Sequence, residues 1–140
     1  MGTQFPRIPC QLCKTCGVES VSAQELRDHW MSYREAAYRE GRTLVVTYFD
    51  TPVAVVLSPV VWRRGLARVP HGDRCREIGV RESRVSLRKL LDRARDGAHT
   101  VITKHRDENA VIAPYAWARE ALPELMGRAS VEGAAEKDSG

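Results

Sequence analysis

Thr43-Leu-Val-Val-Thr47 and Val53-Ala-Val-Val-Leu57 decide the fold, because the same pattern returns as Thr100-Val-Ile-Thr103 and Ala110-Val-Ile-Ala113. Each pair consists mainly of β-branched and small apolar residues, and a short polar or aromatic segment separates its two members. Such a pair of runs predicts a β-hairpin. The chain therefore contains two hairpins of one design.

The segments around the hairpins repeat as well. A helical stretch precedes each hairpin and ends at Gly41 or Gly97, which are 56 residues apart. Pro59-Val-Val-Trp62 or Pro114-Tyr-Ala-Trp117 follows each hairpin and predicts a short helix. We therefore predict an α+β fold of two tandem modules, each ordered strand, helix, β-hairpin, helix. A duplicated unit of this kind is expected to pack about a pseudo-two-fold axis as an intramolecular pseudo-dimer.

The boundaries follow from composition. We expect a cysteine-containing arm (1–17), a first module (18–64), a basic linker (65–77), a second module (78–126) and a polar, disordered tail (127–140). A lone module is close to the size at which a hydrophobic core is marginal. Neither module is expected to be stable alone.

Each module carries one main amphipathic helix. The first is expected to start at Ser22, with Glu25 completing a capping box. Spacings of three and four residues mark the apolar faces. They consist of Leu26, Trp30, Tyr33, Ala37 and Tyr38 in the first module and of Val85, Leu87, Leu90, Leu91 and Ala94 in the second, which opens on a short strand at 78–80.

Composition restricts the class of function. The 140 residues have a formal net charge of +4, which permits nucleic-acid binding without requiring it. No long apolar run and no signal peptide is evident, so we expect a cytoplasmic protein without a membrane partner. No phosphate-binding glycine loop or paired catalytic carboxylates occur, and we expect no enzymatic activity.

The ordered set of elements resembles the Phd/YefM family of antitoxins from bacterial toxin–antitoxin systems. Leu44-Val-Val-Thr47 with Pro52-Val-Ala-Val-Val-Leu57, and Val101-Ile-Thr103 with Ala110-Val-Ile-Ala113-Pro114, carry most of the resemblance. It covers roughly residues 20–64 and 78–119. The chain differs from the family in having two modules where one is usual, a short tail after Trp117 and an additional cysteine arm.

The resemblance implies a module that dimerises through its sheet, binds operator DNA of its own operon and represses it. It also implies a small toxin partner, such as a Fic-like kinase or a RelE-like ribonuclease, that a C-terminal extension blocks. Further self-association of the pseudo-dimer stays open.

The family's DNA surface lies around the start of the first helix of each subunit. The corresponding residues here are Ser22, Gln24 and Arg27 in the first module, and Arg81, Ser83, Arg84 and Arg88 in the second. Arginine suits guanine edges and phosphates, and serine suits the backbone. The turn residues Lys104, His105 and Arg106 are basic and could meet phosphate, whereas Tyr48-Phe49-Asp50 is not basic. The alternative DNA surface is the basic segment from Arg63 to Arg76.

Toxin binding is expected from Leu122, Leu125 and Met126, as an apolar helix face entering a groove. The alternative is that Leu122 and Leu125 only complete the core of the second module.

Cys10, Cys13 and Cys16 form a C-x2-C-x2-C pattern that brings three thiolates together. Zinc or an iron–sulfur cluster is the cofactor such a pattern would hold. Cys75 is the assigned fourth ligand, with His71 and His29 as alternatives. The competing interpretation is three reduced thiols and no required cofactor.

The sequence therefore predicts an antitoxin-like DNA-binding repressor. The alternatives are a transcriptional regulator without a toxin, with a metal- or redox-responsive arm, and a protein-interaction module without a role on DNA.

Overall fold

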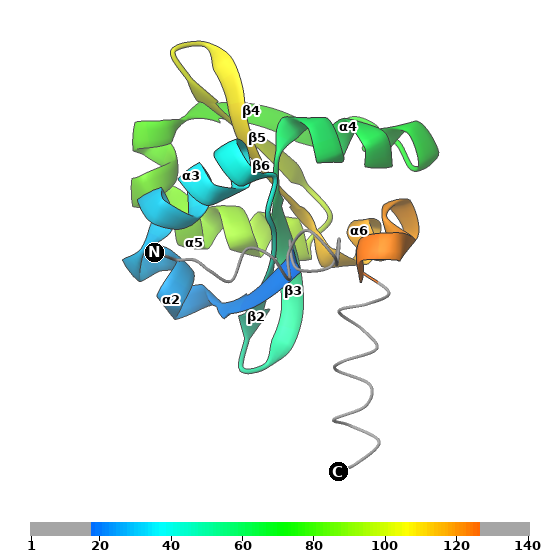
Figure 1. Cartoon of the computed structure of the whole chain (residues 1–140), viewed down its shortest axis with the longest axis horizontal. Helices are drawn as coiled ribbons and strands as arrows, with labels where there is room; N and C mark the ends of the chain where they lie inside the picture. Colours follow the sequence, from blue (N-terminus) through cyan, green and yellow to red (C-terminus); the bar gives the residue numbers. More distant parts are fainter. Residues whose placement is uncertain (1–17, 127–140) are drawn as a thin grey trace.

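The computed structural model describes residues 18–126, which form a six-stranded sheet with helices on both faces (Figure 1). The chain is thus α+β, as predicted. The elements are β1 (Val18–Ser22), α2 (Ala23–Asp28), α3 (Trp30–Glu40), β2 (Thr43–Tyr48), β3 (Thr51–Leu57), α4 (Pro59–Arg68), β4 (Cys75–Gly79), α5 (Val80–Arg95), β5 (His99–Lys104), β6 (Asp107–Pro114) and α6 (Tyr115–Ala121). Among residues 18–126, every helix is too short or too polar to span a membrane.

The strand order β1-β2-β3-β6-β5-β4 is the same when read from either edge. β1 and β4 run parallel to β2 and β5, the two hairpins are antiparallel, and β3 pairs with β6 in the middle of the sheet. Both hairpins also have a register shift at the same place, between Val46 and Thr47 and between Ile102 and Thr103. A pseudo-two-fold axis therefore passes through the central pair Val56–Ile112. We call residues 18–68 the first half and residues 75–126 the second half.

Both hairpins turn through two residues with positive φ. These residues are Phe49 (49°) and Asp50 (68°) in the first half, and His105 (54°) and Arg106 (73°) in the second. Paired positive φ values are typical of the tight turns whose twist matches that of the flanking strands. The two tips project from opposite ends of the molecule (Figure 1).

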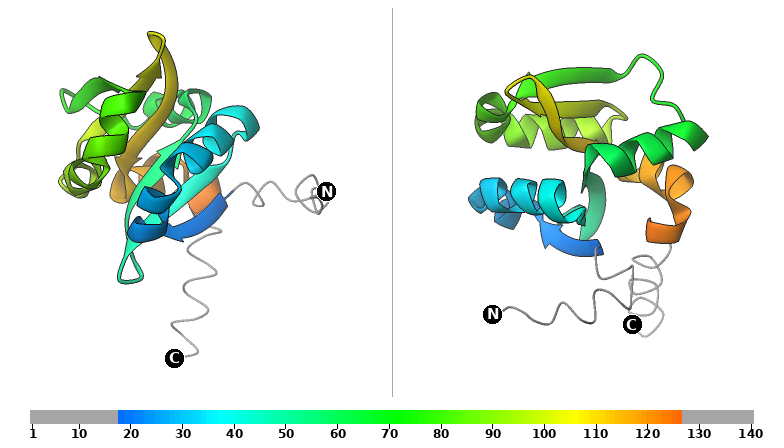
Figure 2. Two further views of the ribbon diagram at one scale, coloured as in Figure 1. Left: turned by 90° about the vertical axis from the view of Figure 1, so that its left-hand side faces the viewer. Right: turned by 45° about the horizontal axis from the view of Figure 1, so that its top comes forward.

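The sheet separates two cores, because successive strand residues point to opposite faces. One core lies under α2, α3 and α5 and includes Leu44, Val56 and Ile112. The other lies under α4 and α6 and includes Val45, Val55 and Val111. Figure 2 (right) shows α4 and α6 on the side opposite α2, α3 and α5. Each core takes residues from both halves, so neither half encloses a core of its own.

The core under α2, α3 and α5 contains two polar contacts between the halves. Trp30 Nε1 donates to Ser83 Oγ at 2.9 Å, and an Arg34 Nη1 hydrogen donates to Asn109 Oδ1. Arg34 and Ser83 are fully buried, and Trp30 and Asn109 are nearly so. The second half has Leu87 and Leu91 at the positions equivalent to Trp30 and Arg34. The polar contacts are thus not repeated by the pseudo-symmetry.

The opposite core contains a histidine among tryptophan rings. Trp62 Nε1 donates to His99 Nδ1 at 3.0 Å, and the rings of His99 and Trp117 form a T-shaped pair at a centroid distance of 4.8 Å. His71 stacks on Trp62. Burial, with a smaller effect of His71, lowers the pKa of His99 to about 4. His99 is therefore neutral at pH 7 and accepts from the indole.

The structure corrects several local expectations. The first long helix is divided at His29 into α2 and α3. The expected linker 65–77 is only 69–74, because α4 continues through Gly65 to Arg68 and β4 begins at Cys75 rather than near 78. Val85 and Tyr38 lie outside the apolar helix faces, with 84% and 51% exposed area.

Candidate nucleic-acid interface

α2 and α5 begin directly after the equivalent strands β1 and β4. Ser22 caps α2, as predicted, and its Oγ accepts from the Glu25 backbone N–H at 3.1 Å. The Glu25 carboxylate accepts from the Tyr33 hydroxyl at 2.8 Å rather than closing a capping box. Burial and this carboxylate raise the pKa of Tyr33 to about 12. Gly79 caps α5 without a side chain.

The two helices present equivalent exposed stripes. Counted from the caps Ser22 and Gly79, both stripes occupy the second, fifth and sixth positions, and the stripe of α5 continues to the ninth position on the same helix face. The stripes consist of Gln24, Arg27 and Asp28 in α2 and of Arg81, Arg84, Val85 and Arg88 in α5, all of them exposed. Figure 2 (left) shows the helices that carry them side by side on one side of the molecule.

The arginines of these stripes have no carboxylate partner in the part of the chain that the structure describes. Within residues 18–126, Arg27, Arg81, Arg84 and Arg88 form no ion pair with a carboxylate. They remain available for an external anion.

The arginines of α4 differ in this respect. Arg63 lies 2.6 Å from Glu108, and Arg64 and Arg68 lie 3.5 Å and 3.4 Å from Glu124. Three of the five arginines between Arg63 and Arg76 are thus paired within the chain. This pairing weakens the alternative DNA surface that the sequence left open.

Tyr48 lies where the charges of arginines from both α2 and α5 act on its hydroxyl group. The Arg95 guanidinium lies 5.6 Å from the centre of the Tyr48 ring. Burial and Asp92 raise the pKa of Tyr48, and Arg88, Arg27 and Arg95 oppose that rise. Arginines from α2 and α5 therefore surround one point between the halves.

The other predicted DNA residues divide into two groups. Ser83 lies outside the exposed surface, because it is fully buried, donates to the Val80 carbonyl and accepts from Trp30. His105 and Arg106 are exposed at the β5–β6 tip, while Lys104 lies 3.5 Å from Glu35. The opposite tip has Phe49, with 99% exposed area, and Asp50.

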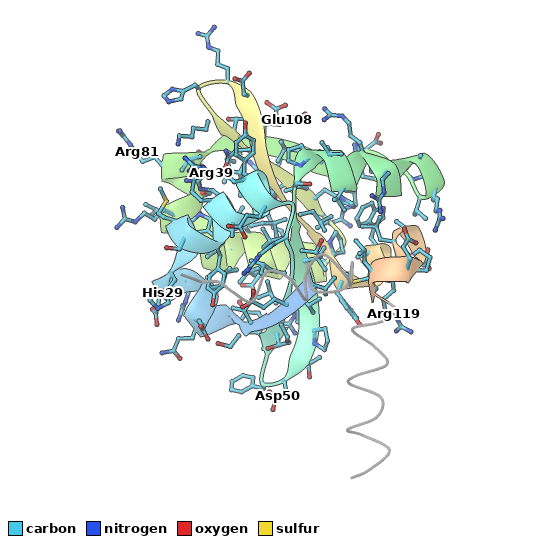
Figure 3. The ribbon with its side chains drawn as sticks, in the orientation of Figure 1. His29, Arg39, Asp50, Arg81, Glu108 and Arg119 are labelled. Carbon is cyan, nitrogen blue, oxygen red and sulfur yellow. The ribbon has the colours of Figure 1, made fainter. Side chains whose placement is uncertain are left out.

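Figure 3 shows the orientation of labelled side chains. Arg81, at the start of α5, and His29, between α2 and α3, project from the same side of the molecule, and Arg119 of α6 projects from the other. Asp50 lies at the end of the β2–β3 hairpin, and Glu108 lies on β6 close to the end of the β5–β6 hairpin. The candidate interface is therefore the helical side between these ends.

The residues predicted to bind a toxin lie at the end of the core under α4 and α6. Leu122 and Met126 are each 1% exposed, and Leu125 is partly buried beside them. This arrangement is the one expected if they complete the core.

The predicted metal ligands Cys10, Cys13 and Cys16 lie outside the described residues. Cys75 is a half-buried free thiol on β4, and burial raises its pKa. His71 stacks on Trp62, and His29 is exposed. Residues 18–126 by themselves contain no group of three histidine, cysteine or acidic side chains placed to hold a metal ion.

The structure also contains a groove that the sequence did not indicate. It has a volume of about 700 Å³ and lies between the end of α3, the start of α4 and the β5–β6 turn. Tyr38, Val60 and Arg106 are among its lining residues. In the sequence, the run Pro59-Val-Val-Trp62 was the one indication of this groove, because Val60 is out of phase with Trp62 along the helix. In the structure Trp62 is buried, whereas Val60 is 72% exposed.

Comparisons with protein-family models, with curated proteins and with solved structures gave no match to this chain. The likeness to Phd/YefM antitoxins therefore remains a resemblance in the order and pattern of the elements.

Proposed function

We propose that this chain is an antitoxin-like, DNA-binding repressor in which two Phd/YefM-type modules in one chain take the place of a homodimer. The observation that carries the proposal is the pair of equivalent helix stripes whose arginines have no ion pair within residues 18–126. DNA is the partner that such a surface fits, since its phosphates neutralise arginine and its major groove offers guanine acceptors.

Two further features support this proposal. The strand order reads the same from both edges, so one chain offers two helix stripes where a dimer would offer one per subunit. The arginines of α4 are already paired with Glu108 and Glu124. The arginines of the two stripes thus differ from those of α4, which already have carboxylate partners.

The test is binding of the full chain to DNA from upstream of its own coding sequence, followed by fluorescence anisotropy. Arg27→Ala/Arg84→Ala is expected to weaken binding at least tenfold and to reduce the dependence of affinity on salt. Arg64→Ala/Arg119→Ala is the matched control, because it removes the same charge from the α4 and α6 side. Circular dichroism establishes that both variants fold.

Equal losses in the two variants would show that only total charge matters. No loss in Arg27→Ala/Arg84→Ala would exclude this surface and leave the basic segment from Arg63 to Arg76 as the alternative DNA surface. Absence of DNA binding by the wild-type protein would favour the protein-interaction alternative.

The toxin partner rests on the resemblance. A regulator without a toxin would give the same DNA result, so a second experiment separates the two. Co-purification with the product of a neighbouring small reading frame, lost on deletion of residues 121–140 with DNA binding retained, supports the antitoxin. Because Leu122 and Met126 are buried, a large loss of thermal stability in that deletion would instead place their role in the core.

A further inference from the structure

The two helix stripes are equivalent in position but not in chemistry. Gln24 is the second residue of α2, and Arg81 is the second residue of α5. Three positions later the halves agree, with Arg27 and Arg84. At the sixth position Asp28 corresponds to Val85.

These differences fall on residues that read DNA bases differently. A glutamine side chain can bond an adenine through N6 and N7, whereas an arginine can bond a guanine through O6 and N7. Valine can contact a thymine methyl group, whereas aspartate repels phosphate and accepts from cytosine. Two half-sites read by such unlike stripes would differ in sequence.

The interior of the protein fixes which stripes lie side by side. Arg34 of the first half bonds Asn109 of the second, and the position equivalent to Asn109 in the first half is Val53. If two first halves paired, the buried Arg34 would face Val53, lose its Asn109 acceptor and keep the Glu35 carboxylate, 3.6 Å away. A buried charged group that loses a hydrogen-bond acceptor destabilises the fold.

The Trp30–Ser83 hydrogen bond also favours the pairing of a first half with a second half. The position equivalent to Ser83 is Leu26, which offers the Trp30 indole no acceptor. The core therefore accepts one first half with one second half, and the surface always presents one stripe of each kind.

We propose that the operator is not a palindrome but joins two unlike half-sites, an inference that rests on the proposed function. The half-site under α5 has guanine at the base contacted by Arg81, and the half-site under α2 has adenine at the corresponding base contacted by Gln24. Both half-sites share the base read by Arg27 and Arg84. Gln24 and Arg81 are thus the residues that set the difference between the half-sites.

The experiment is selection of binding sites by the full chain from a pool of random-sequence duplex DNA, with sequencing of the retained fraction. The wild-type protein is expected to enrich a motif of two unlike halves. Gln24→Arg makes the stripes alike at this position and is expected to enrich guanine at both corresponding bases. Arg81→Gln is expected to enrich adenine at both.

Direct binding measures the effect. Exchange of adenine for guanine at the base under Gln24 is expected to weaken wild-type binding by roughly 5- to 150-fold and to favour Gln24→Arg. Arg119→Gln, on the opposite side, is the control and should retain the wild-type motif.

The outcomes separate this inference from the function on which it rests. Absence of any enriched motif would contradict the proposed sequence-specific DNA binding itself. A palindromic motif for the wild-type protein, or a motif unchanged by Gln24→Arg, would overturn the unlike half-sites while DNA binding stands.

Discussion

The two halves of the molecule agree in their strands and differ in their helices. Ala54, Val55 and Val56 of β3 correspond to Ala110, Val111 and Ile112 of β6, and the burial of these residues is the same. In the helices, Trp30 and Arg34 correspond to Leu87 and Leu91. Central strands are packed on both faces and held in register, so their residues have few alternatives. A buried helix position can change its chemistry provided that its partner across the interface changes with it.

Separating the two halves is expected to have the largest effect on folding. Residues 18–68 and 75–126, expressed apart, are each expected to remain unfolded, because both cores need side chains from both halves. Circular dichroism and urea titration would show no cooperative transition for either fragment and a folded signal when the fragments are mixed. Two stable monomeric halves would contradict the shared cores.

The second prediction concerns the Arg34–Asn109 contact. Asn109→Val, which installs the residue of the equivalent position Val53, should lower the free energy of unfolding by about 3 kcal/mol, because the buried Arg34 guanidinium loses its Asn109 acceptor, although it keeps the Glu35 carboxylate at 3.6 Å. Arg34→Leu/Asn109→Val, which makes the interface apolar, should recover most of that loss. Urea unfolding of the single variants and the double variant measures the coupling, and additive losses would mean that the two residues do not act as a pair.

The third prediction concerns His99, whose equivalent in the first half is Thr43. The folded-state pKa of His99 is about 4 and therefore lies below its ordinary value of 6.5, so the contribution of the neutral ring is complete above pH 6.5. It is lost as the pH falls from 6.5 towards 4, by on the order of 3 kcal/mol. Between pH 7 and pH 4, the free energy of unfolding of His99→Thr should fall less steeply with decreasing pH than that of the wild-type protein. Parallel curves would exclude His99 as the source of the pH dependence.

The smallest expected effect is at the helix caps. Ser22 caps α2 with its side chain, whereas Gly79 has no side chain and an added Cβ would meet no atom within 4 Å. Gly79→Ser should raise the stability by a few tenths of a kcal/mol, and Ser22→Ala should lower it by about 1 kcal/mol. Thermal melting measures both. A destabilised Gly79→Ser would indicate that the open backbone at this cap has another role.

The sequence was most informative where structure is local. The β-branched runs and their turn segments predicted both hairpins, because strand and turn preferences act over a few residues. The break at His29 was not predictable, since it depends on how α2 and α3 meet the sheet. Val85 was misplaced because its spacing does not match the buried stripe of Leu87, Leu91 and Ala94, and stricter use of the helical period would have shown this.

The candidate site was predicted only in part. The exposed arginines followed from the resemblance and the helix starts. The burial of Ser83 depends on Trp30, which lies in the other half of the chain, so no local pattern contains it. The ion pairs of Arg63, Arg64 and Arg68 likewise join residues far apart in the sequence.

The short connection at residues 69–74 has a consequence for mass action. A two-chain dimer dissociates on dilution, and the fraction of intact dimer depends on how much protein is present. Here the two halves belong to one molecule, so their association is unimolecular and its effective concentration is set by the connection alone. The fraction of molecules with an assembled sheet is therefore the same at low and at high protein concentration.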